Sequence, residues 1–258
     1  MTINNIARNQ MSPAMQRLAS GNRVNSAADD AAGAAIIEQL TAQLQGLDQG
    51  IANTMDMQAL AMTAEGGLDG ISDSLNRIRE LSVQAANGTN TDLTRSIIQT
   101  EITQLADQIQ SAVSNTEFNT RSLLDGGAQN LNTASGPDGT GATVSINDMS
   151  SLAQAVANFN VTGSFNINDI DSAINEVSGQ RAELGAMMNR MDFTANANSV
   201  ASLNMADARS RIADADIAAE MAALNEDRVI NEMEILMQQQ EQQRVEEQNE
   251  MLAPGVAR

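Results

Sequence analysis

The chain has 258 residues and a formal net charge of −19, and it contains no Cys, His, Trp or Tyr. Without Cys and His it lacks thiol nucleophiles, imidazole acid–base pairs, disulfides and the usual zinc ligands. We therefore expect no catalytic site, no metal site and no cofactor, and so acidic a chain is a poor partner for nucleic acid. Apart from four Phe, the large apolar residues are Leu, Ile, Val and Met, and together with Ala they suit long helices packed side by side.

No apolar run approaches the roughly 20 residues that cross a bilayer, so no membrane insertion is expected. The first residues, Met1 to Asn5, have neither a basic nor an apolar region of the kind found in a secretory signal peptide. Taken alone, this favours a cytoplasmic protein. The absence of a signal peptide does not exclude export by a dedicated system that recognises other signals.

The first element predicted along the chain is a short helix. Ser12-Pro13 marks its start, because Ser is a good N-cap and Pro fits the first helical position. The helix carries Met15 and Leu18 and ends at Gly21.

A long amphipathic helix is predicted from about Ala31, because apolar residues recur there at alternating spacings of three and four. Glu65-Gly66-Gly67 and Gly70 are expected to break it, and a second helix then restarts. The first seam consists of Ile37, Leu40, Leu44, Leu47 and Ile51, continued more weakly by Met55, Ala59 and Met62. The second consists of Ile71, Leu75, Ile78 and Ala85.

Residues 86–90 are predicted to form a loop, and a third helical face follows it. Residues 126–147 differ in kind, because they are rich in Gly and because residues 143–146 alternate with period two. We predict a small β-hairpin that turns at Gly136–Gly139, with a disordered surface loop as the alternative. The third helical face consists of Ile98, Ile102, Leu105, Ile109 and Val113.

Helical patterning returns after Asn168, with Arg181 in the seam position between Val177 and Leu184. Arg181 either specifies register as a polar core residue or lies at the helix edge with its guanidinium in water; we favour the edge. The seam consists of Ile170, Ile174, Val177, Leu184, Met188 and Met191. A further helix carries Ile212, Ile217, Met221 and Leu224, and continues through Val229, Ile230, Met233, Leu236 and Met237.

These patterns predict a mainly α fold. We expect an antiparallel bundle of long helices with a small β-hairpin, plus paired N- and C-terminal coiled-coil helices. The abundant Met residues are read as core at heptad positions, although a Met stripe also makes an adaptable binding face.

Four segments resemble characteristic motifs of the bacterial flagellins, in the family's order: residues 18–33, residues 77–90, residues 180–186 with 189–190, and residues 208–218. Hook–filament junction proteins share this helical plan but typically have Pro after the paired aspartates. Here Asp29-Asp30 is followed by Ala31-Ala32-Gly33, which favours a flagellin. The matching signature positions are Ser20, Gly21, Arg23, Asn25, Asp29, Asp30, Arg209, Arg211, Ile212, Asp214 and Asp216.

The resemblance implies a structural subunit of the flagellar filament, exported by the flagellar apparatus to the outside of the cell, which reverses the cytoplasmic expectation. It implies an inner domain of residues 1–32 and 214–258 and a helical bundle domain of residues 33–127 and 164–213. It also implies that residues 128–163 form a short β-hairpin and loop insert in place of outer domains. The implied partners are other flagellin subunits, hook-associated and cap proteins, and an export chaperone.

The resemblance also implies a contact surface formed by Arg77, Leu81, Gln84 and Glu101. These positions match those that the vertebrate Toll-like receptor five contacts in flagellins. The first three are spaced four and three apart, so they can share a helix face. The alternative is that this surface packs against a neighbouring subunit, and both uses are compatible.

Paired carboxylates such as Asp29-Asp30, or Asp214 with Asp216, suggest catalysis only when a partner acid or nucleophile completes a closed site. We interpret them as charges at helix starts and as groups that make interdomain hydrogen bonds. An adhesin normally needs a larger middle segment, and a protease-bearing flagellin needs histidines, so both classes fit poorly.

Both arms depart from the family pattern. The chain before Ser20-Gly21 is shorter than usual, and residues 238–244 are rich in Gln and Glu instead of apolar. Three explanations remain open: a specialised subunit, a subunit that polymerises only with a second flagellin, or a secreted relative that forms no filament. The second is favoured, because the bundle motifs are intact while the arms are altered.

Overall fold

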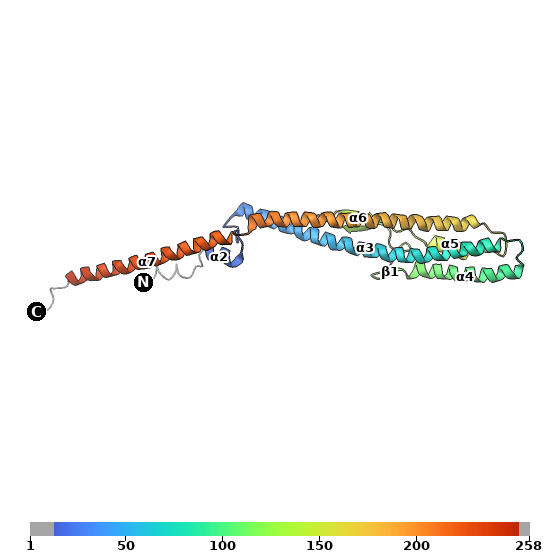
Figure 1. The fold of residues 1–258 in the computed structure, drawn as a ribbon, viewed down its shortest axis with the longest axis horizontal. Helices are drawn as coiled ribbons and strands as arrows, with labels where there is room; N and C mark the ends of the chain where they lie inside the picture. Colours follow the sequence, from blue (N-terminus) through green and yellow to red (C-terminus); the bar gives the residue numbers. More distant parts are fainter. Residues whose placement is uncertain (1–12, 253–258) are drawn as a thin grey trace. The chain divides into compact units, whose positions relative to one another are not determined.

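The computed structural model describes residues 13–252 (Figure 1). Helix accounts for 74% of the structure, which confirms the mainly α fold class. The expected N-cap at Ser12 and the chain end after Leu252 lie outside the described residues. The helices are α2 (Pro13–Ser20), α3 (Ala31–Ala85), α4 (Asp92–Asn115), α5 (Ser150–Ala157), α6 (Ile167–Ala213) and α7 (Ile217–Leu252). The strands are β1 (Glu117–Phe118), β2 (Arg121–Ser122), β3 (Leu131–Ala134) and β4 (Gly141–Val144).

The chain divides into two units, one made of residues up to 42 with those from 204 onward, and the other of residues 43–203. The predicted domain boundaries, 1–32 with 214–258, 33–127 with 164–213, and 128–163, remain predictions. Within the described part of the chain, no helix is long and apolar enough to cross a membrane.

The unit of residues 43–203 is an antiparallel bundle of α3, α4 and α6 (Figure 1). Three contacts between α3 and α6 fix their direction: Asp48 with Ser202, Glu65 with Arg181, and Arg79 with Asp171. The positions rise along α3 as they fall along α6, so the two helices are antiparallel.

The predicted break in the long first helix is wrong, because α3 continues from Ala31 to Ala85 without interruption. Gly66 and Gly70 have open space where a Cβ would lie. They lower the stability of the helix only through the low helix propensity of Gly, which is too small an effect to break it. Gly67 has a positive role, because a Cβ there would lie 2.5 Å from Oγ1 of Thr116. The absent side chain therefore lets the segment after α4 pack directly on α3.

The buried seam of α3 keeps one heptad frame, which the apolar pattern only partly reveals. The predicted continuation through Met55 and Met62 is wrong, since these side chains are 58% and 56% exposed. The frame passes instead through the buried Thr54, whose hydroxyl donates to the Gly50 carbonyl at 2.7 Å. The buried or partly buried frame positions are Leu47, Gly50, Thr54, Met57, Ala61, Ala64, Leu68, Ile71, Leu75, Ile78, Ser82 and Ala85.

On α6 the polar residue in the seam is Gln180, which is 2% exposed, and not Arg181. The Gln180 side chain accepts from the backbone N–H of Asn147 at 3.2 Å. Arg181 lies at the helix edge as expected, but its guanidinium is paired: it donates to Glu65 at 2.8 and 2.9 Å and lies 2.8 Å from Asp69. Hydrogen bonding to Glu65 raises the pKa of Arg181.

The predicted hairpin is confirmed, with β3 and β4 antiparallel and Leu131 opposite Val144. Its turn packs on α3 so closely that a Cβ on Gly50 would collide with the Ser135 carbonyl oxygen. Asn53 of α3 donates to the Ala134 carbonyl at 2.9 Å, and Asn198 of α6 donates to the Ser135 carbonyl at 2.7 Å. The hairpin is therefore held between both long helices.

Two elements of the middle segment were not predicted: the β1–β2 pair and helix α5. Val144, Ile146 and Met149 are fully buried, as are parts of α5. Residues 131–161 therefore contribute to the same core as α3, α4 and α6.

Candidate functional site

The predicted contact surface centres on Arg77 of α3, which ties α3 to α4. Its guanidinium donates to Glu101 of α4 at 2.7 and 2.9 Å and to Glu80 at 2.6 Å. These hydrogen bonds, first to Glu101 and then to Glu80, raise the pKa of Arg77. The cluster is solvent-accessible, with the Arg77 and Glu101 side chains each 45% exposed.

Gln84 is also exposed, but Leu81 is not. Leu81 is only 2% exposed and belongs to the core, so its expected place on the surface is wrong. A heptad frame explains the difference, because Leu81 lies beside the seam positions Ile78 and Ser82 on the inner face of α3. The contact surface therefore reduces to Arg77, Gln84 and Glu101.

The sequence patterns missed a second arginine close to this surface. Arg79 donates to Asp171 of α6 at 2.5 Å, and this hydrogen bond raises the pKa of Arg79. Arg77 and Arg79 are two residues apart, which places them on different sides of α3. One arginine therefore joins α3 to α4, and the other joins α3 to α6.

The two signature regions meet in the unit that contains both chain ends. Asn22 pairs with Asp214 in an isolated antiparallel bridge. The backbone N–H of Arg23 donates to the Ala213 carbonyl at 2.6 Å, and that of Ala215 donates to the Gly21 carbonyl at 2.9 Å. Gly21 has φ of +71°, which Gly adopts without strain. The N-terminal signature is thus hydrogen-bonded to the break between α6 and α7.

Arginine side chains reinforce this junction. Arg23 donates to the Ile212 carbonyl at 2.8 Å and lies 3.8 Å from the Asp30 carboxylate. Arg17 of α2 donates to Glu220 of α7 at 3.2 Å. These contacts support the predicted pairing of N- and C-terminal helices. Arg209 and Arg211 are exposed on α6.

Two of the signature carboxylates, Asp30 and Asp216, lie at helix starts, as the sequence predicted. Asp30 accepts from the N–H of Gly33 at 2.8 Å in the first turn of α3, and a Cβ on Gly33 would collide with the Asp30 carboxylate. Asp216 accepts from the N–H groups of Ala218 and Ala219 at 3.0 and 3.2 Å. Both carboxylates therefore satisfy backbone donors at a helix start.

Asp29 and Asp214 stabilise the neighbouring loops. Asp29 accepts from the N–H groups of Ser26 and Asn25 at 2.9 and 3.1 Å and from the Ser26 hydroxyl at 3.1 Å. The bonds from Ser26, followed by that from Asn25, lower the pKa of Asp29. Asp214 accepts from the Ser210 hydroxyl. Ser20 caps its own turn, with its hydroxyl accepting from the N–H of Asn22 at 3.1 Å.

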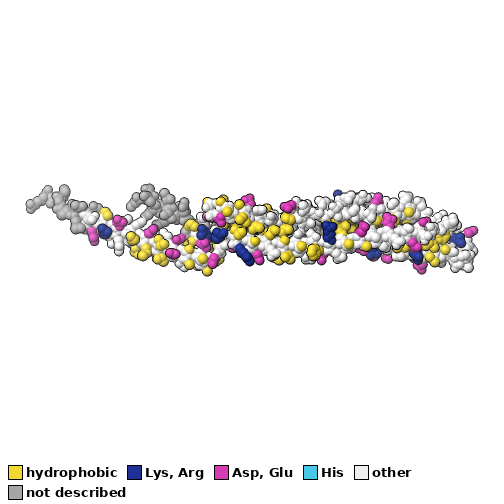
Figure 2. Space-filling model, turned by 90° about the horizontal axis from the view of Figure 1, so that it is seen from above, with side chains coloured by type: hydrophobic (Ala, Val, Ile, Leu, Met, Phe, Trp, Pro, Cys, Tyr) yellow, Lys and Arg dark blue, Asp and Glu magenta, His cyan; other side chains and the backbone are white. Residues whose placement is uncertain are grey.

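An apolar stripe runs along the middle of α7. Its members are 49% to 69% exposed, because no described residue of the same unit covers them. Apolar side chains and carboxylates are interspersed on the face of the molecule in Figure 2. The stripe consists of Val229, Ile230, Met233, Leu236 and Met237.

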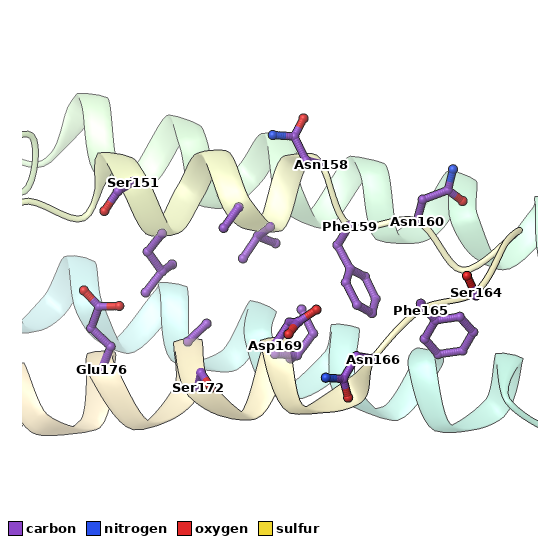
Figure 3. Close-up of a pocket in the computed structure, with 15 residues that line it drawn as sticks. Ser151, Asn158, Phe159, Asn160, Ser164, Phe165, Asn166, Asp169, Ser172 and Glu176 are labelled. Carbon is purple, nitrogen blue, oxygen red and sulfur yellow. The ribbon is translucent and has the colours of Figure 1, made fainter.

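A pocket of about 480 Å³ lies between α5 and the start of α6 (Figure 3). Phe159 and Phe165 line it and stack edge to face with their centroids 5.8 Å apart. Gln99 of α4 holds the adjoining loop, donating to the Phe159 carbonyl at 3.0 Å and accepting from Val161 N–H at 2.7 Å. The polar residues that line the pocket are Ser and Asn together with Asp169 and Glu176. This lining offers no nucleophile paired with a base.

Three features define a helical assembly subunit: the long antiparallel helices, the hydrogen bonds between residues 21–23 and residues 213–215, and the exposed apolar stripe of α7. The chain belongs to the bacterial flagellin family: residues 1–129 match the bacterial flagellin N-terminal helical region, and residues 167–249 match the C-terminal helical region. This family is structural and not enzymatic.

Flagellar proteins that match most of the chain support the same family assignment. The chain is 38% identical to a flagellin of Halalkalibacterium halodurans over 232 residues, covering 87% of this chain and 85% of the relative. It is 35% identical to the flagellar filament 33 kDa core protein of Treponema phagedenis over 237 residues, covering 84% of this chain and 83% of the relative.

Solved structures share the fold. The crystal structure of Bacillus cereus flagellin matches with a TM-score of 0.51 at 31% identity, covering 57% of this chain and 88% of that one. A putative flagellar hook-associated protein from Vibrio parahaemolyticus matches with a TM-score of 0.55 at 22% identity, covering 72% of this chain and all of the other. At that identity the second likeness concerns the fold alone.

Proposed function

We infer that the chain is a structural subunit of the bacterial flagellar filament, in which it packs against other flagellin subunits. The observation that carries this inference is the exposed apolar stripe of α7. An isolated helix with such a stripe is marginal in water, so the stripe needs a partner surface. Each Leu or Met fully buried there contributes about 1.5–3 kcal/mol. A contact between unlike surfaces that does not close a ring extends into a helical polymer.

The stripe can be tested by replacing Met233 and Leu236 with Glu and measuring how much protein sediments with filament seeds. We expect the double variant to stay in the supernatant, because assembly would bury two carboxylates. Gln242→Glu is the matched control, since position 242 lies on the opposite side of α7 and is exposed. Equal sedimentation of the stripe variant and the parent chain would contradict the assigned role.

The source of the seeds separates the alternatives. A subunit that polymerises alone elongates seeds of its own kind, whereas a minor or co-assembling subunit elongates only seeds of a second flagellin. A junction protein binds filament ends without elongating them. The Gln- and Glu-rich residues after 237 favour co-assembly, because they offer little apolar area for burial against a neighbour.

The same family membership supports three further partners: an export chaperone, hook-associated proteins and the filament cap. A filament subunit must leave the cell, so we propose that the chain is secreted and resides outside it. Detection of the intact chain in culture medium of a strain with working flagellar export, and its loss when that export is disabled, tests the location. Retention in the cytoplasm of both strains would contradict it.

We propose that Arg77, Gln84 and Glu101 form a surface that contacts either a neighbouring subunit or Toll-like receptor five. In favour of this role, all three side chains are accessible, and two are held in one arrangement by ion pairing. Reporter-cell activation by Arg77→Ala should be weaker than by the parent chain, with Arg211→Ala as an exposed control. Equal potency of Arg77→Ala and the parent would remove the receptor role.

A further inference from the structure

Asn87-Gly88 is the only Asn-Gly pair in the sequence, and both residues are exposed in the turn between α3 and α4. Asn side chains can be attacked by the backbone nitrogen of the next residue. Gly offers the least hindrance to that attack, because it has no Cβ. The pair is thus the position in this chain at which an Asn amide is most open to its own backbone.

The turn also fixes the position of the Asn87 side chain through hydrogen bonds. Its Oδ1 accepts from the N–H of Thr89 at 3.1 Å and from the Thr89 hydroxyl at 3.0 Å. The first bond defines an Asx turn, in which the side chain folds back over the following peptide. Oδ1 of Asn87 is therefore held beside the following peptide, within hydrogen-bond distance of both donors of Thr89.

The two donors have a chemical consequence. Negative charge develops on Oδ1 when a nucleophile adds to Cγ, and hydrogen-bond donors placed at that oxygen stabilise it. The turn itself is held in place, because Asn90 donates to the Asn87 carbonyl at 3.1 Å and to the Gln84 carbonyl at 2.5 Å. The folded turn thus holds both donors ready before reaction begins.

We propose that Asn87 is a site of spontaneous deamidation, with Thr89 as a positioning residue. The Gly88 nitrogen forms a bond to Cγ of Asn87, and the side-chain nitrogen leaves as ammonia with the proton from Gly88. Water then opens the resulting succinimide. Cleavage of the bond between Cγ and the Gly88 nitrogen leaves an ordinary aspartate at this position, and cleavage of the bond to the former backbone carbonyl leaves an isoaspartate.

No other Asn in the sequence is followed by Gly. Asn53 and Asn198 donate their side-chain amides to the hairpin carbonyls and are followed by Thr54 and Ser199, whose Cβ atoms hinder the attack. Deamidation at Asn87 places a carboxylate three residues from Gln84. The isoaspartate product also adds an atom to the main chain, so the turn must rearrange next to the proposed contact surface.

The test is to incubate the purified full-length protein at mildly alkaline pH and follow the peptide containing Asn87 by mass spectrometry. We expect conversion of the amide to a carboxylate at Asn87, two chromatographically separate products, and slower conversion at the other Asn residues. Gly88→Ala should slow the reaction about tenfold, the effect of a modest rise in its barrier. A Cβ at position 88 meets nothing within 4 Å, so this variant keeps the fold.

Thr89→Val keeps the backbone donor and removes the hydroxyl donor, so it should slow the reaction about fivefold, the effect of one hydrogen bond. Circular dichroism of each variant checks that the helices are intact. An unchanged amide at Asn87 while other Asn residues convert would overturn the proposal, as would a Gly88→Ala rate equal to that of the parent. A Thr89→Val rate equal to that of the parent would overturn the positioning role.

Discussion

At the scale of single residues, the most informative side chains are the polar ones that hold helices together. Arg181 is the clearest case, because one guanidinium meets Glu65 and Asp69 of α3. The second oxygen of Glu65, Oε2, is buried without a hydrogen-bond partner among the described residues. Removal of Arg181 therefore leaves a partly buried carboxylate uncompensated, which costs more than the pair itself contributes.

A double-mutant cycle measures this pair. We expect Arg181→Ala to lower the free energy of unfolding, and Glu65→Gln to restore part of the loss in the double variant. The coupling energy should be about 1 kcal/mol, as for partly exposed ion pairs, and should fall as salt is added. Additive effects in urea unfolding would show that the two side chains act independently.

Asp29 predicts a defined dependence of stability on pH. Its pKa lies below the ordinary value of 3.8, since Ser26 and Asn25 hydrogen-bond the ionised form. The folded state therefore binds fewer protons than the unfolded state in the interval between the two pKa values, and stability falls as pH drops through it. The contribution is complete above the unfolded pKa and absent below the folded one.

The measurement compares Asp29→Asn with the parent in thermal unfolding at neutral pH and below pH 3.8. The variant should be less stable at neutral pH, and the difference should shrink as the pH falls through the folded pKa. A difference that stays constant across this range would show that the Asp29 charge does not contribute.

At the scale of elements, α3 shows why glycines in one helix have different roles. Gly50 lies against the hairpin turn, whereas Gly66 faces open space. We expect Gly50→Ala to destabilise the bundle by about 1–3 kcal/mol, since the new methyl group must displace the Ser135 carbonyl. Gly66→Ala should stabilise it by about 0.5–1 kcal/mol through helix propensity.

The measurement is urea unfolding of the two variants. Each variant is a matched control for the other, because both replace Gly with Ala in the same helix. Equal effects would contradict the close packing of the hairpin on α3. Stabilisation by Gly66→Ala would also confirm that α3 is continuous there, where the sequence predicted a break.

The elements show how far sequence reasoning reached. Strong apolar periodicity predicted α4 and the first part of α6, and Gly spacing with alternation predicted the β3–β4 hairpin. The prediction of the α3 seam failed at Thr54, because the seam was sought among apolar residues. A Thr whose hydroxyl donates to a carbonyl of its own helix can take the place of an apolar residue in the core. Helix α5 is only eight residues long, too short for a periodic signal to rise above a loop.

The candidate site was predicted unevenly for a similar reason. The capping roles of Asp30 and Asp216 are local, so the sequence alone predicts them. The burial of Leu81 and the pairing of Arg79 with Asp171 depend on which face α3 turns inward. The inward face of α3 is determined by the heptad pattern of the whole helix. The spacing of Arg77, Leu81 and Gln84 shows only that these three residues can share a face, not whether that face is buried.

At the scale of the whole molecule, the two units have different needs. The unit of residues 43–203 has a continuous buried core built from its helices and hairpin. The unit that contains the chain ends exposes the α7 stripe, and stabilising that helix requires burial against another surface. Filament assembly supplies such a surface, so α7 should be the part of the described chain that changes most on assembly.

Hydrogen exchange of the α7 backbone, measured in the free chain and after sedimentation into filaments, tests this central claim most directly. We predict rapid exchange of residues 229–237 in the free chain and strong protection in the filament, with little change in the bundle core at positions such as Leu75 and Ile109. Equal exchange of residues 229–237 in both states would contradict burial of the stripe, and with it the proposed mode of assembly.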